Sequence, residues 1–189
     1  GGGSHACGIM YAFLDDERVN LYANEAAGNG PESGRHAIRF APGTGELGMF
    51  QGAKSYLLEN PEGQTLDTYS ISAGLDYASV GPEHAWLKDI GRVNYSWATD
   101  QEAMSAFKDL CETEGIIPAI ESSHAVAGAY KAAADLKAKG YEHPVMIINI
   151  SGRGDKDMNT AGKWFGYLTD EQAKALESNG AQGNNADGE

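Results

Sequence analysis

The chain has 189 residues, of which 41% are apolar and 22% charged, a composition typical of a globular protein with one sizeable domain. Its formal net charge of -13 excludes a general nucleic-acid binder, because a phosphate backbone is bound by clustered Lys and Arg. The sequence has no apolar run long enough to cross a bilayer, no secretory leader and only two cysteines, so we expect a soluble protein of the reducing cytoplasm.

The chain opens on a glycine-rich segment, Gly1-Gly2-Gly3-Ser4-His5, that has no strand before it. Glycine amides can approach an anion closely, and a short helix expected over 7–14 would add its positive end, so the segment is a candidate phosphate loop. An engineered flexible linker has the same composition. Because a phosphate loop needs a strand that enters it, we expect the sequence to be a fragment cut within a domain.

Strand and helix patterns alternate along the first half of the chain. Val19–Glu25 alternates apolar and polar side chains like a strand, and a long irregular excursion follows over Gly28–Gly48. Met49–Leu58 fits either a strand or a short helix. Pro82 marks the start of a helix, because its fixed φ suits the first turn, and Val93–Ala98 fits a buried strand.

The second half carries clearer helix signals. Thr99 and Glu102 form a capping box, which predicts a helix as far as residue 114. Ser122 or Ser123 can cap a further helix that reaches about residue 139, where a glycine stops it. Val145–Ile150 has almost no polar residue and fits a buried central strand.

This alternation predicts an α/β fold, a three-layer αβα arrangement whose mostly parallel sheet is covered by helices on both faces. Ligands then bind at the carboxyl ends of the strands. The apolar pattern ends after residue 168, so we expect one domain over 1–168 and a disordered tail over 169–189.

Ser151 directly follows the predicted strand Val145–Ile150, in a position where ligands bind. A serine hydroxyl can bond a ring nitrogen without forcing it to carry a charge, whereas an aspartate would stabilise the protonated ring. An ordinary turn with a helix cap explains the same residues. We give no functional weight to the cell-adhesion tripeptide at 153–155, because so short a motif occurs by chance.

Two acids lie in settings that suit a site. Glu121 follows an apolar run at the start of a helix, where an acid also favours the helix dipole. Asp76 lies in a loop with glycines and an aromatic residue. His84 and His124 fall on predicted helices, where a structural or exposed role is the more common one, and no pair of histidines has zinc spacing, so we expect no catalytic metal.

Together, the order and spacing of these segments resemble the tryptophan synthase β family. The resemblance covers most of the chain up to about Tyr167, namely the glycine loop and residues 32–36, 70–84, 113–127 and 149–157. The family's loop ends in Asn where His5 stands here. The resemblance implies a fold-type II pyridoxal-phosphate enzyme, a lyase of tryptophan biosynthesis that condenses L-serine with indole to give L-tryptophan and water.

The resemblance also implies roles for single residues. Glu121 would lie beside the ring of pyridoxal 5'-phosphate, the hydroxyl of Ser151 would bond the pyridine nitrogen, and Asp76 would help to close the site around the amino-acid substrate. The remaining implied contacts are the cofactor phosphate, held by Gly1, Gly2, Gly3, Ser4 and His5, and a monovalent cation, bound by the backbone carbonyls of Gly1, Tyr77 and Ser79.

The partners that the resemblance implies are an α subunit, which makes indole and passes it through an internal channel, and a second β chain in a homodimer. Phe50 lies where an aromatic residue that lines the channel is expected. We expect no nucleic acid and no membrane among the partners.

The lysine that forms the family's Schiff base would lie upstream of Gly1, and Lys54, Lys88 and Lys156 match no such motif. We therefore expect this polypeptide to be inactive by itself. The alternatives are a related pyridoxal-phosphate serine or threonine dehydratase-like lyase, a module that binds the cofactor without catalysis, and a structural fragment that self-associates through an exposed apolar edge.

Overall fold

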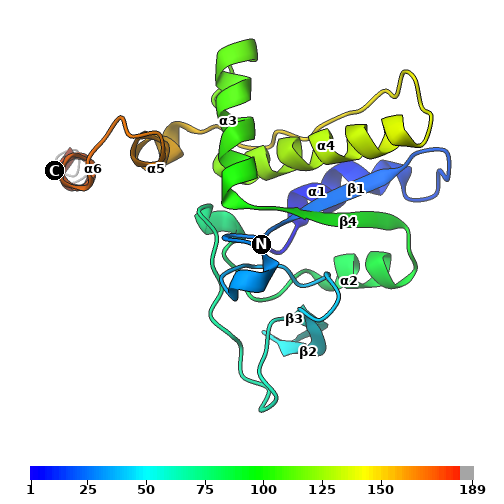
Figure 1. The fold of residues 1–189 in the computed structure, drawn as a ribbon. Helices are drawn as coiled ribbons and strands as arrows, with labels where there is room; N and C mark the ends of the chain where they lie inside the picture. Colours follow the sequence, from blue (N-terminus) through cyan, green and yellow to red (C-terminus); the bar gives the residue numbers. More distant parts are fainter. Residues whose placement is uncertain (184–189) are drawn as a thin grey trace, which may run out of the picture.

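The computed structural model describes residues 1–183 and has an α/β architecture built on a small parallel sheet (Figure 1). Strands β1 (Leu21–Ala26) and β4 (Val93–Ala98) pair in parallel, and both lie where the sequence predicts strands. Strands β2 (Glu46–Phe50) and β3 (Ala53–Leu57) form a separate antiparallel hairpin. The stretch that fitted a strand or a helix is therefore strand, and the predicted α/β class with a parallel sheet is confirmed.

Helices cover both faces of this sheet. Helix α2 (Pro82–Asp89) lies on one face and helix α4 (Ile120–Ala138) on the other (Figure 1). Helix α1 (Ser4–Met10) joins the α2 face, in a core formed by Met10, Leu21, Leu87 and Val93. On the opposite face, Ala98 of β4 packs with Val126 and Ala127 of α4.

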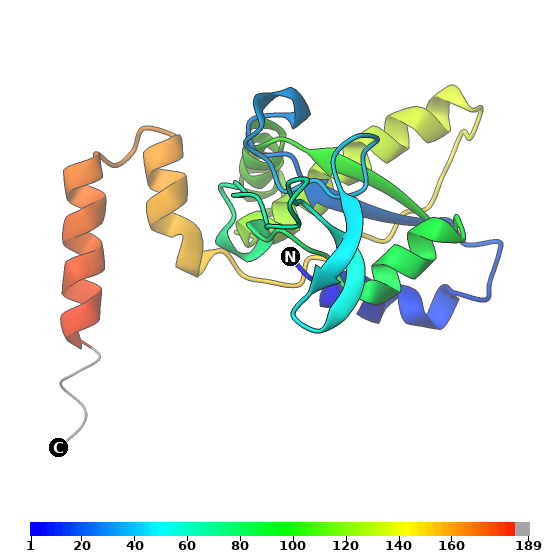
Figure 2. The ribbon, with the colours of Figure 1, turned by 90° about the horizontal axis from the view of Figure 1, so that it is seen from below.

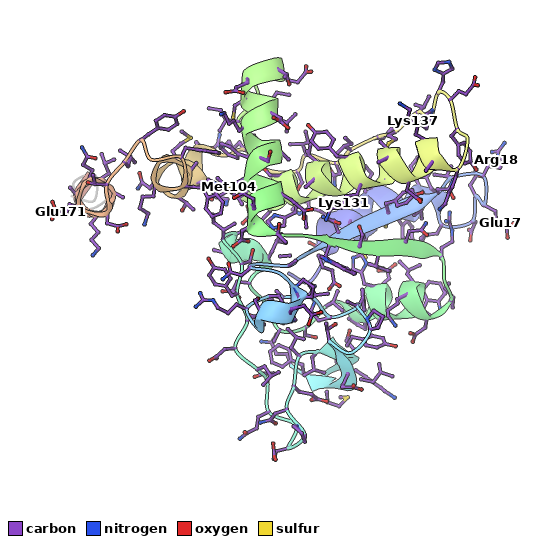
Figure 3. The ribbon with its side chains drawn as sticks, viewed as in Figure 1. Glu17, Arg18, Met104, Lys131, Lys137 and Glu171 are labelled. Atoms are coloured by element: carbon purple, nitrogen blue, oxygen red, sulfur yellow. The ribbon has the colours of Figure 1, made fainter. Side chains whose placement is uncertain are left out.

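Helix α3 (Asp100–Glu114) begins at the predicted capping box, in which Thr99 and Glu102 bond each other's backbone N–H groups. It crosses α4 at a steep angle, and its fully buried Met104 packs against Ile120 of α4 and Ala161 of helix α5 (Met158–Trp164) (Figure 3). Lys131 points from α4 toward the end of β4, where its Nζ donates to the carbonyl of Trp97 at 2.9 Å (Figure 3).

Helix α4 begins earlier than predicted. Its N-cap is Ala119, and Ser122 and Ser123 lie inside the first turn, so the prediction that one of these serines caps the helix is wrong. The capping bond comes from far along the chain, because Oδ2 of Asp157 accepts from the N–H of Ile120 at 3.0 Å. The segment around Asp157 is thereby fixed to the start of α4.

The prediction of a buried strand over Val145–Ile150 is wrong. The segment is extended but pairs with no strand of the described residues, and 96% of Val145 and 80% of Ile147 is exposed. A central strand needs a neighbour on each side, and the parallel sheet described here consists of β1 and β4. The apolar pattern identifies a segment suited to a sheet, but pairing depends on other parts of the protein.

The C-terminal segment differs from the expected disordered tail. Helix α6 (Asp170–Gly183) follows α5, and the two stand apart from the sheet (Figure 2). Thr169 and Gln172 each accept the other's backbone N–H, which is a capping box that the polar composition conceals. The tail prediction for 184–189 lies outside the described residues.

Short 3-10 helices occur in the connections: η1 (Tyr11–Phe13), η2 (Pro31–Ser33), η3 (Ala73–Leu75) and η4 (Asp155–Asp157). Within the described residues, no helix combines the length and the apolar character needed to cross a bilayer.

Candidate functional site

A cavity of about 930 Å³ brings together segments that are far apart in the sequence. Its lining includes the whole glycine segment Gly1–His5, Glu121 at the start of α4, and Ser151. Strand β1 runs along it, and the extended segment 144–149 forms part of its wall. The residues that the sequence predicts to hold a phosphate and a ring therefore share one cavity.

The glycine segment is packed so closely that two of its residues cannot carry a side chain. A Cβ on Gly3 would lie 2.3 Å from Nε2 of His84, and Gly3 has a φ of 84°, which glycine adopts without strain. A Cβ on Gly1 would lie 2.5 Å from the carbonyl oxygen of Gly74. Gly2 is different, because a Cβ there would meet no atom within 4 Å. The backbone is thus held at Gly1 and at Gly3, while the space beside Gly2 between them is open.

His84, a buried residue of α2, contacts the glycine segment at Gly3. It is 2% exposed, its Nε2 lies 2.8 Å from the carbonyl oxygen of Gly3, and its Nδ1 lies 2.7 Å from the hydroxyl of Tyr95. The Sγ of Cys7 lies 3.2 Å from the same Nε2. The sequence allowed a structural role for His84 but gave no sign of this contact. The one available signal was its position two residues after Pro82, in the first turn of α2.

Glu121 is held by contacts from two directions. Its Oε1 accepts from the N–H of Gly74 at 3.1 Å, and its Oε2 lies 2.9 Å from Nζ of Lys156. Burial opposes the ionisation of Glu121, but the hydrogen bonds from Lys156 and from neighbouring groups outweigh it and lower the pKa of the carboxyl group. Glu121 is therefore ionised at neutral pH, at the edge of the cavity.

The glycines that follow Ser151 attach its segment to the residues just before α4. The N–H of Gly154 donates to the carbonyl of Ile117, and the carbonyl of Gly152 accepts from the N–H of Ala119, at 2.9 and 2.8 Å. A Cβ on Gly154 would lie 2.2 Å from the carbonyl oxygen of Pro118, so only glycine fits there. These bonds explain why a Ser-Gly-Arg-Gly segment suits this position.

Other predicted residues lie outside the cavity lining. Asp76 accepts from the hydroxyl of Thr68 at 2.6 Å, and Tyr77 and Ser79 follow it on the same connection. The ring of Phe50 packs edge to face on that of Tyr77, with centroids 5.6 Å apart. The structure therefore keeps Asp76 near the loop that contacts Glu121 without bringing it into the cavity wall.

A buried ion pair that the sequence did not indicate lies next to the glycine segment. Arg39 is 4% exposed, and its Nε donates to Oε1 of Glu25 at 2.8 Å. Its Nη1 donates to the carbonyl of Tyr77 at 2.7 Å, and its Nη2 donates to the carbonyl of Gly1 at 3.2 Å. Two of the three carbonyls expected to bind a monovalent cation are thus bonded to a guanidinium group, so the residues present do not fit an added cation there.

Several curated proteins that resemble this chain in sequence carry the same name. The chain is 60% identical over 168 residues to the tryptophan synthase beta chain of Mycobacterium tuberculosis, and 57% identical over 169 residues to that of Mycobacterium leprae. The match to the tryptophan synthase beta chain of Bordetella petrii is 51% over 166 residues. These matches cover 88–89% of this chain, which spans only 38–40% of the relatives' length.

Among solved structures, a fungal L-serine ammonia-lyase from Rhizomucor miehei has a similar fold, with a TM-score of 0.53 over 86% of this chain and 47% of that one. Its 13% sequence identity supports a shared fold and nothing more. No family model matches the chain. On the strength of the sequence matches, the chain is a homologue of one part of the tryptophan synthase beta chain.

Proposed function

We propose that this chain provides the part of a pyridoxal-phosphate lyase that holds the phosphate and the ring nitrogen of the cofactor. The whole reaction would be that of tryptophan synthase, the condensation of L-serine with indole to give L-tryptophan and water. The observation that carries the proposal is the single cavity that Gly1–His5, Glu121 and Ser151 line together. The names of the sequence relatives support the choice of reaction.

The glycine segment fits a phosphate group. Gly1 and Gly3 are fixed by close backbone and ring contacts, while the space beside Gly2 is open. The first N–H groups of a helix have no acceptor within it, and α1 begins at Ser4, so the N–H groups at this end remain available to an anion. The backbone of Gly2, Gly3, Ser4 and His5 would hold the phosphate.

Ser151 and Glu121 suit the ring of the cofactor. Among the described residues, no group bonds the hydroxyl of Ser151, which is free to donate to a pyridine nitrogen. A hydroxyl partner leaves that nitrogen neutral, whereas a carboxylate would favour the protonated form. Glu121 would lie beside the ring and Asp76 would help to close the site around the amino acid. When bound, pyridoxal phosphate supplies the electron sink for chemistry at the substrate's α and β carbons.

The covalent attachment of the cofactor is assigned to a lysine outside these 189 residues. None of the described residues that line the cavity is a lysine, and the nearby Lys156 is bonded to Glu121 and Asp157. The assembly proposed for the whole enzyme is a β homodimer that binds an indole-producing α subunit in the cytoplasm. The monovalent cation implied by the family is not proposed for the carbonyls of Gly1 and Tyr77, because Arg39 already binds them.

Binding of pyridoxal 5'-phosphate to the purified chain, measured by equilibrium dialysis, tests the proposal. We expect Ser151→Ala to weaken binding by roughly three- to tenfold, the equivalent of one hydrogen bond, and Ser105→Ala on the exposed face of α3 to leave it unchanged. Pyridoxal without its phosphate should bind more weakly still. An absence of cofactor binding, or equal binding by the Ser151 and Ser105 variants, contradicts the proposal.

A further inference from the structure

The surroundings of Arg39 have the composition of a cation site. The guanidinium contacts one carboxylate, that of Glu25, and two backbone carbonyl oxygens, those of Gly1 and Tyr77. Carboxylate and carbonyl oxygens are the ligands that hard metal cations take in proteins. With Arg39 removed, these oxygens would face one another with one negative charge and without the guanidinium that bonds all of them.

Glu25 is committed to this site by more than the ion pair. It is 7% exposed, its Oε1 also accepts from the backbone N–H of Arg39 at 3.0 Å, and its Oε2 accepts from the N–H of Phe40 at 2.9 Å. These two backbone bonds would hold the carboxylate of Glu25 in place even without the side chain of Arg39. The guanidinium of Arg39 is therefore the group in this site that another cation could replace.

Arg39 also connects three separate segments. Gly1 belongs to the glycine segment, Tyr77 to the connection that carries Asp76, and Glu25 to β1. A guanidinium presents donors in a fixed planar fork, so one group can bond all three at once. The carbonyl of Gly1 is thereby held one residue from the open position at Gly2.

We propose that Arg39 is a positioning residue whose guanidinium takes the place of an inorganic monovalent cation and holds the glycine segment to the connection at Tyr77. The chain therefore needs no added Na⁺ or K⁺ at this site. Removing the guanidinium, while Glu25 and the carbonyls stay, creates a site that such a cation fills. This inference needs no bound cofactor and stands independently of the proposed function.

Thermal unfolding of the full chain in potassium chloride and in choline chloride of equal ionic strength tests the inference. We expect the wild-type chain to have the same Tm in both salts. Arg39→Met should lose roughly 10 °C in choline chloride, because it leaves a buried carboxylate unpaired, and should recover at least half of that loss as K⁺ is added, with saturation.

Two further variants separate this role from ordinary stabilisation. Arg92 also donates to backbone carbonyls, those of Phe13, Leu14, Asp16 and Val19, but among the described residues no carboxylate accepts a hydrogen bond from it. Arg92→Met should therefore be destabilised equally in both salts. Arg39→Lys keeps a positive charge, so its Tm should lie between those of wild type and Arg39→Met and should not respond to K⁺.

Two results overturn the inference. The first is a wild-type Tm that rises in K⁺ relative to choline, and the second is an Arg39→Met variant whose Tm is the same in both salts. If Arg39→Met does not fold, thallium-205 NMR of the wild-type chain decides, since Tl⁺ substitutes for K⁺. Saturable Tl⁺ binding to the wild type overturns the inference, and its absence supports it.

Discussion

Nε2 of His84 lies 2.8 Å from the carbonyl oxygen of Gly3, although the two residues are 81 positions apart in the sequence. A carbonyl can only accept, so Nε2 carries the proton and Nδ1 is left to accept from the hydroxyl of Tyr95. Burial is the main reason why the pKa of Tyr95 is raised, so its phenol stays protonated and can donate at neutral pH. Through these contacts, His84 and Tyr95 fix the position of the Gly3 carbonyl in the cavity wall.

His84→Leu should destabilise the chain, because the carbonyl of Gly3 and the hydroxyl of Tyr95 would lose a buried partner. The expected cost is about 1–3 kcal/mol, or a fall in Tm of roughly 5 °C, measured by thermal unfolding. His143→Leu is the matched control, since His143 is exposed and should change Tm little. Equal Tm values for the two variants would show that the His84 contact contributes nothing.

Gly2→Ala should separate folding from anion binding. A methyl group at Gly2 meets no protein atom within 4 Å, so Tm should be unchanged, but the group enters the space proposed for the cofactor phosphate. We expect the affinity for pyridoxal 5'-phosphate to fall at least about tenfold, the effect of roughly 1.4 kcal/mol. Gly8→Ala, also in open space but on the exposed side of α1, is the control and should bind as the wild type does.

Lys156→Met should raise the pKa of Glu121. Burial disfavours the charged carboxylate, and the bonds from Lys156 reverse that effect, so the folded pKa lies below the unfolded one. The contacts of Glu121 thus add stability above the unfolded pKa, and this stability is lost as pH falls through the folded pKa. Carboxyl carbon-13 NMR during an acid titration measures the change.

The control for that titration is Lys108→Met, which removes the surface partner of Glu112 on α3 and leaves the cavity intact. It should not move the titration of Glu121. A Lys156 variant in which Glu121 titrates as in the wild type would show that burial and the other hydrogen bonds alone set this pKa.

The purified 189-residue chain should form no tryptophan from L-serine and indole in the presence of pyridoxal 5'-phosphate. The reason is that no lysine occurs among the described residues of the cavity lining. Borohydride reduction followed by mass spectrometry should likewise reveal no stoichiometric cofactor adduct on a lysine. Turnover, or a specific adduct on Lys156, would show that this chain supplies its own covalent partner.

The sequence predicted the elements that depend on local signals. Pro82 at the first position of α2 and the Thr99 and Glu102 capping box are each complete within a few residues, and both occur as expected. Val145–Ile150 was misjudged because its strand character depends on neighbours elsewhere. The capping of α4 by Asp157 is invisible locally for the same reason.

The candidate site divides in the same way. The glycine segment, Glu121 and Ser151 were predicted by motif and resemblance, and the structure places them around one cavity. Arg39 was missed because it lies in the irregular stretch 28–48, where a charged residue is normally solvated. Its apolar neighbours Ile38 and Phe40 were the one available signal, and the carbonyls that it binds are 38 residues away.

The exposed segment 144–150 also makes the chain open to cleavage by a protease. It combines aliphatic side chains with an extended backbone outside any helix or strand, which is the form of substrate that a protease binds. A cut there leaves Glu121 on one fragment and Ser151 on the other. The two halves of the cavity would then be held together by non-covalent contacts, among them the pairing of residues 117–119 with 152–154, the bond of Asp157 to the N–H of Ile120, and the packing of α5 on α3.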